Sequence, residues 1–112
     1  MGYDAGLAER VAAAFVALGQ PHARPKNVFG GRGFMLGKSA AVIVADEGLI
    51  VKTPPGEYRA ALEEPGVTAF APGGERPMST WVVVDAEALA DDPQLEEWVG
   101  RGIRAVGRGS AA

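Results

Sequence analysis

The chain has 112 residues, 47% of them hydrophobic and 22% charged, and its formal net charge is −3. This composition is that of a globular protein with one core, and the acidic balance argues against a protein that binds nucleic acid through its phosphates. The lack of cysteine excludes disulfides, thiol catalysis and thiolate zinc sites, and no apolar run approaches the ~20 residues of a membrane span. We therefore expect one domain over residues 1–112, in the cytoplasm, without a metal, a cofactor or a membrane contact.

Residues 4–18 predict an amphipathic helix. Asp4 is placed to cap its N-terminus, because an aspartate carboxylate accepts hydrogen bonds from the free backbone amides there. Gly19 is placed to end the helix in the left-handed conformation. One face of this helix is apolar at helical spacing: Leu7, Val11, Phe15 and Leu18.

The next segment predicts a loop followed by three strands. Residues 20–27 contain two prolines and are expected to be loop, whereas 28–36 predict a strand interrupted by glycines. After a turn at Gly37-Lys38, the apolar runs 40–45 and 49–52 predict two further strands with a tight turn between them. Short connections of this kind indicate an antiparallel meander.

A second helix is predicted over residues 53–64, with Thr53 as its N-cap and Pro54 at its first position. Two short strands are then predicted at 67–70 and 78–84. The loop between these strands is rich in proline and glycine, which is typical of a hairpin connection.

Asp85 is placed to cap a short turn over 86–90, and a last helix is predicted to follow, with Asp92 as its N-cap and Pro93 first. Acidic residues crowd the start of this helix and basic residues its end, which opposes the helix dipole favourably. We expect residues 108–112 to be disordered. An apolar stripe indicates that the helix packs on the core: Leu95, Trp98, Val99, Ile103 and Val106.

The predicted order of elements is therefore α-β-β-β-α-β-β-α. This order indicates an α+β fold, in which helices pack on one face of an antiparallel sheet of about five strands.

Several spaced features together resemble the N-terminal domain of the TfoX/Sxy family of bacterial-type competence regulators. They include Gly37-Lys38, a strand ending at Lys52, and an F-G-G-x-x-F pattern, and the resemblance extends over roughly residues 3–106. It implies a small α+β domain whose molecular activity is undefined. The full-length regulators carry a second, helical domain for which this chain is too short, so we expect a stand-alone member. The structural motif residues that carry the resemblance are Phe29, Gly30, Gly31, Phe34, Met78, Trp81 and Trp98.

A ligand site is one interpretation of the glycine-rich segment. Successive backbone amides at Gly30 and Gly31, with the charge of Arg32, can form a concave anion-binding nest. The predicted site would also include Lys52, Tyr58 and Arg76. The competing structural interpretation is a bulge or tight turn that lets the sheet bend, with Lys52 simply exposed to solvent.

Catalytic residues are not indicated by any pattern in the chain. There is no Ser/His/Asp order, metal-ligand spacing or dinucleotide fingerprint, although an enzyme that uses tyrosine, lysine or a carboxylate stays open. His22 lies in a proline-flanked loop, where we expect it at the surface. The acidic doublets fall at turns and helix ends, where capping and solubility explain them.

Three functions follow from these observations. The first is a non-catalytic regulatory or protein-interaction module, which presents a sheet face, an edge strand or the glycine loop to a protein partner or to a second copy. The second is a binder of a small anionic ligand, or an enzyme, with its site near residues 30–33. The third is a nucleic-acid-associated regulator that uses basic side chains from both ends of the chain: Arg24, Lys26, Arg101, Arg104 and Arg108.

Overall fold

The computed structural model describes residues 4–28, 30–71 and 80–111, and it describes side chains as far as Gly107. Within these residues the order of elements is α-β-β-β-β-α-β-β-η-α, which confirms the predicted α+β class. The elements are α1 (Ala5–Ala17), β1 (Arg24–Val28), β2 (Gly31–Leu36), β3 (Ser39–Ala45), β4 (Gly48–Lys52), α2 (Tyr58–Leu62), β5 (Val67–Ala69), β6 (Trp81–Val84), the 3-10 helix η2 (Glu87–Leu89) and α3 (Asp92–Ala111).

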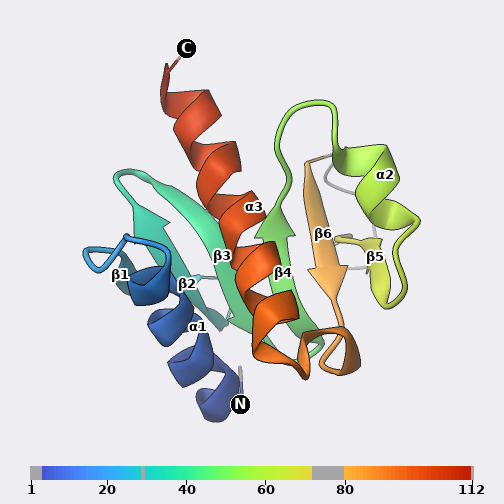
Figure 1. Cartoon of the computed structure of the whole chain (residues 1–112), viewed down its shortest axis with the longest axis horizontal. Coiled ribbons are helices and arrows are strands. Elements are labelled where there is room, and N and C mark those ends of the chain that lie inside the picture. The colour runs from blue at the N-terminus through green and yellow to red at the C-terminus, as the bar shows by residue number, and fades with distance from the viewer. Residues whose placement is uncertain (1–3, 29, 72–79, 112) are drawn as a thin grey trace.

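The strands form a single open sheet in the order β1-β2-β3-β4-β6-β5 (Figure 1). In the described part of the chain the sheet has six strands, one more than predicted, and every neighbouring pair is antiparallel. Strand β6 lies between β4 and β5, so the chain leaves the sheet after β4, forms α2, and returns at the outer edge.

The extra strand is β1, which corrects the prediction of a loop over 20–27 and of one interrupted strand over 28–36. Residues 24–28 pair with β2 from Arg24 opposite Met35 to Val28 opposite Gly31. The two strands are therefore a hairpin, and Gly30 takes the left-handed conformation in its turn (φ +75). Proline and lysine suit this strand because it is an edge, where one side of the backbone needs no partner.

Helix α2 is shorter than predicted, and Thr53 is not its N-cap. Both the backbone N–H and the hydroxyl of Thr53 donate to the carbonyl oxygen of Thr80, at 2.7 and 2.9 Å. These bonds extend the pairing of β4 with β6 by one residue, which keeps the chain extended. A left-handed turn at Gly56 (φ +83) then follows, and the helix begins only at Tyr58.

The start of α3 also differs from the prediction. The backbone N–H groups of Gln94 and Leu95 both donate to the carbonyl oxygen of Asp91, so the residue that precedes the helix is Asp91 and not Asp92. The Asp92 carboxylate instead binds Arg10 of α1 at 3.0 Å. Arg10 also donates to the carbonyl oxygen of Leu89 at 2.8 Å, and so joins α1 to the segment that leads into α3.

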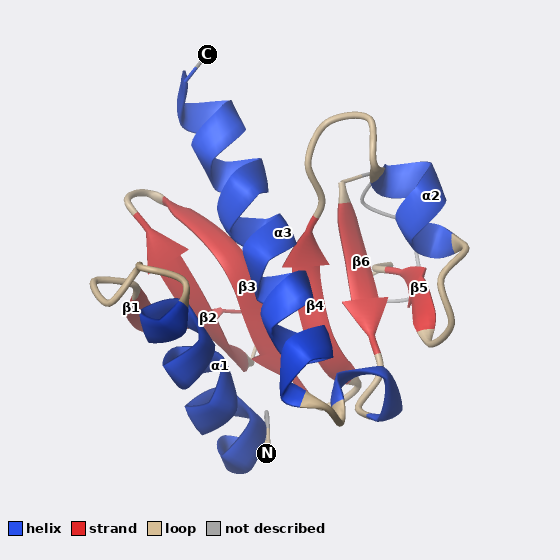
Figure 2. Cartoon of the chain, viewed as in Figure 1, coloured by secondary structure: helices blue, strands red, loops and turns tan. Residues whose placement is uncertain are grey.

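Helices α1 and α3 lie across the same face of the sheet, with α3 running diagonally over its centre (Figure 2). Helix α3 contacts β3 and β4, and α1 packs beside it. The rings of Phe15 and Phe34 stack at 5.5 Å between α1 and β2, and Trp98 of α3 is buried in the same core. None of the helices in the described chain is both long enough and apolar enough to cross a membrane.

The predicted cap of α1 is confirmed, because an Asp4 carboxylate oxygen accepts a hydrogen bond from the Leu7 N–H at 3.1 Å. Replacing Asp4 with alanine is expected to lower the free energy of unfolding by about 1 kcal/mol, because that amide loses its partner. Urea unfolding of Asp4→Ala and Asp4→Asn checks this expectation. Asparagine retains a capping oxygen, so equal losses in the two variants would contradict the assigned role.

Candidate functional site

The residues predicted to form a ligand site do not lie together. Gly31 lies beside the turn between β3 and β4, since Arg32 pairs with Val44 and Ala45 pairs with Gly48. Lys52 is at the opposite end of β4, on the side where the chain leads into α2. Tyr58 begins α2 and is half-buried against the core. Arg76 lies outside the described residues, so the described candidates divide between two ends of the sheet.

Close packing explains the glycines of the β1–β2 hairpin. A Cβ on Gly31 would collide with the carbonyl oxygen of Val44, and one on Gly33 would lie 2.8 Å from a methyl group of Val28. The glycines therefore let the hairpin pack tightly on itself and on β3, as the structural interpretation of this segment requires.

The other motif residues have structural surroundings where they are described. Phe34 and Trp98 are buried in the core beneath the helices, and Trp81 is half-buried against the cluster on the opposite face of the sheet. Phe29 and Met78 lie outside the described residues.

A groove that the sequence did not predict lies between α3, η2 and the turn that joins α2 to β5. We call it the Arg101 groove, and its volume is about 360 Å³. A smaller hollow that includes Gly66 and Asp85 adjoins it, since the two share three lining residues. The Arg101 groove is lined by Glu64, Pro65, Glu87, Ala88, Pro93, Gln94, Glu97, Trp98 and Arg101.

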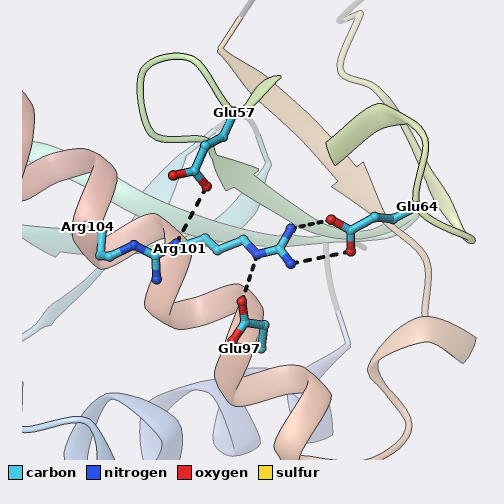
Figure 3. Close-up of polar contacts among 5 residues, drawn as sticks. All are labelled: Glu57, Glu64, Glu97, Arg101 and Arg104. Carbon is cyan, nitrogen blue, oxygen red and sulfur yellow. Dashed lines mark hydrogen bonds and ion pairs between the residues drawn. The ribbon is translucent and has the colours of Figure 1, made fainter. Parts of the chain in front are cut away.

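Arg101 is the central side chain of this groove. Its guanidinium donates to the two carboxylate oxygens of Glu64 at 2.6 and 3.4 Å, and to Glu97 at 3.1 Å (Figure 3). The guanidinium carbon also lies 4.1 Å from the centre of the Trp98 ring. A flat cation is therefore held over an aromatic ring and between two carboxylates, an arrangement that suits guanidinium better than ammonium.

The Arg101 side chain is only 17% exposed. Burial alone would lower the pKa of its guanidinium, but the hydrogen bonds that it donates to Glu64 and Glu97, together with the negative charges of these carboxylates, outweigh this effect and raise the pKa above its ordinary value. Arg101 therefore stays charged and is not suited to proton transfer.

Arg104 lies one turn further along α3 and pairs with Glu57 at 3.6 Å (Figure 3). Arg104 thus pairs with the carboxylate just before α2, and Arg101 pairs with Glu64, just after α2. Arg24, at the β1 edge, donates to the carbonyl oxygen of Gly37 at 2.6 Å. The arginines considered for nucleic-acid binding are therefore engaged within the chain wherever their side chains are described.

Only part of the Arg101 groove was visible in the sequence. Glu97 and Arg101 are four residues apart in a predicted helix, which is the spacing of a helical ion pair. Glu64, however, is 37 residues from Arg101 in the sequence, and no spacing rule connects them. Within the part of the chain that the structure describes, no cluster of histidine and acidic side chains could hold a metal ion.

The fold and groove define a class of protein: a small α+β domain with helices on one face of an open antiparallel sheet and a surface groove beside the longest described helix. Comparison with protein families gives the particular family. The sequence model of the TfoX N-terminal domain matches residues 15–106, and the chain belongs to that family. Searches of curated proteins and of solved structures found no match.

Proposed function

We propose that this chain is a non-catalytic interaction module of the TfoX N-terminal domain family, and that its Arg101 groove binds a short segment of a partner protein. The observation that carries the proposal is the groove itself, which combines apolar surface from two prolines and Trp98 with charged side chains at its walls. Aromatic residues and arginine are enriched at protein interfaces, where they supply much of the binding energy.

The contacts of the charged side chains support a binding role over a catalytic one. Glu64 and Glu97 are both hydrogen-bonded to Arg101, and the raised pKa of Arg101 keeps it from donating a proton. A catalytic acid or base needs a pKa close to the working pH. These three side chains instead form a pattern of charge that a partner can recognise.

The sheet edges are less suited to recognition by strand addition. The outer strand β1 carries Pro25 and Lys26 among its exposed residues, and the other outer strand, β5, has only three residues. Proline, lysine and short length are the features by which proteins block pairing at a sheet edge. This observation favours the groove over an edge strand as the surface that meets the partner.

Selection of peptides from a random display library against the purified chain tests this function. We expect the selected peptides to lose about tenfold or more in affinity for the Gln94→Trp variant, because an indole at this exposed position fills the groove that Gln94 lines. Ala60→Trp is the control, since Ala60 is exposed on α2 and does not line the groove. Equal affinities of both variants and the parent chain would contradict the proposed site.

A further inference from the structure

We infer that the segment bound in the Arg101 groove is basic, and that one of its arginine side chains replaces Arg101 between Trp98 and Glu64. This inference rests on the proposed function and names the chemistry of the partner. Three observations support it: the negative charge of the groove, the geometry in which Arg101 itself is held, and the hydrogen bond of Arg101 to a second carboxylate, that of Glu97.

The groove has an excess of negative charge. Its walls carry the carboxylates of Glu64, Glu87 and Glu97 against one guanidinium, which leaves a net charge of −2. Glu87 forms no ion pair with any cation of the described chain, and Asp85 adds a further carboxylate in the adjoining hollow. A basic segment complements this charge, whereas an acidic one is repelled.

Arg101 shows which cation the groove recognises. Its guanidinium meets both oxygens of Glu64 while it lies 4.1 Å from the centre of the Trp98 ring. A two-point contact with a carboxylate, combined with stacking on an aromatic face, is specific for guanidinium. The groove is therefore a guanidinium site that the chain itself occupies.

When the partner's arginine replaces Arg101 at Glu64, neither guanidinium is left without a carboxylate partner. Arg101 also donates to Glu97, four residues before it on α3, at 3.1 Å. When an incoming arginine takes Glu64, Arg101 retains Glu97 as its partner. Arg101 then competes with the bound segment for Glu64 and Trp98. This competition weakens the binding of every segment, and it prevents binding of segments that have no arginine to take the place of Arg101.

Three short synthetic peptides, identical except for arginine, lysine or glutamate at two positions, test the inference by calorimetry with the full chain. We expect the arginine peptide to bind most tightly and the glutamate peptide to show no binding. Arg101→Gln is expected to tighten binding of the arginine peptide by about tenfold, because the competing contact is removed. Glu64→Gln is expected to weaken it, whereas Glu63→Gln, an equal change of charge at an exposed residue outside the groove, leaves it unchanged.

Loss of affinity, or no change, in a folded Arg101→Gln variant would overturn the inference, since Arg101 would then contact the partner or have no part in binding. Circular dichroism establishes whether the variant is folded. Arg101→Lys provides the same test if glutamine prevents folding, because lysine keeps the charge but loses the two-point contact, and the arginine peptide should again bind more tightly. Preference of the groove for neutral or acidic peptides would overturn the inference and leave the proposed function standing. If neither the display library nor these peptides bind the parent chain or Arg101→Gln, the proposed function fails as well.

Discussion

Gly102→Ala is expected to lower the free energy of unfolding by about 2 kcal/mol, although alanine forms helix better than glycine by about 1 kcal/mol. Gly102 lies where α3 crosses β3. A Cβ there would be 2.5 Å from the carbonyl oxygen of Ala41 and 2.9 Å from a methyl carbon of Val42. Since the first of these atoms belongs to the strand backbone, helix and sheet must move apart to admit the methyl group.

Gly107→Ala is the matched control in the same helix. A Cβ at Gly107 would have no neighbour within 4 Å, so the substitution acts only on helix propensity. We expect it to raise the free energy of unfolding by about 0.5–1 kcal/mol. Urea unfolding of the two variants and the parent chain measures both changes in the free energy of unfolding, a decrease for Gly102→Ala and an increase for Gly107→Ala. Changes of the same sign would mean that α3 does not pack on β3 at Gly102.

Trp98→Ala is expected to have the largest effect, lowering the free energy of unfolding by about 3–4 kcal/mol. Trp98 is 5% exposed in the core beneath the helices, and it also supports the guanidinium of Arg101. The same substitution should abolish binding of the arginine peptide at temperatures where the variant is still folded, because the aromatic face of the groove is lost.

Trp81→Ala separates these two roles. Trp81 is half-buried on the other face of the sheet and does not line the Arg101 groove. We expect a smaller loss of stability, about 1–2 kcal/mol, and unchanged affinity for the arginine peptide. Thermal unfolding first defines the temperatures at which both tryptophan variants are folded. Calorimetric titration with the arginine peptide at such a temperature then compares their affinities. Loss of binding in Trp81→Ala with retention in Trp98→Ala would contradict the placement of the site.

Local signals predicted those parts of the fold in which neighbouring residues determine the outcome. The Asp4 cap, the left-handed end of α1 at Gly19 and the Asp85 cap of the η2 turn all depend on residues within one turn of each other, and all were predicted. The apolar stripe of α3 was predicted for the same reason, since helical spacing alone brings Leu95 and Val99 onto one face.

Tertiary contacts decided the parts that were not predicted. Strand β1 has the composition of a loop and is a strand because it pairs with β2. Thr53 has the composition of an N-cap, but its hydrogen bonds to Thr80 keep it in extended backbone. The Arg101 groove depends on Glu64, a residue distant in sequence, which reaches Arg101 only because the sheet order places the end of α2 beside α3. No pattern within one segment contains this information.

The most direct test of the account is a map of backbone amide shifts by nuclear magnetic resonance while the arginine peptide is added to the full chain. We expect the perturbed amides to cluster at residues 64 and 66, 85–88 and 94–101, in the segments that surround the Arg101 groove. The Arg101 side-chain Nε–H, which donates to Glu97, should shift together with them, because the rest of the guanidinium leaves Glu64. A different hollow lies between α1 and the β1–β2 hairpin, and it is lined by Ala5, Ala8, Glu9, Ala12, Pro25, Arg32 and Phe34. Perturbation centred there would contradict the account.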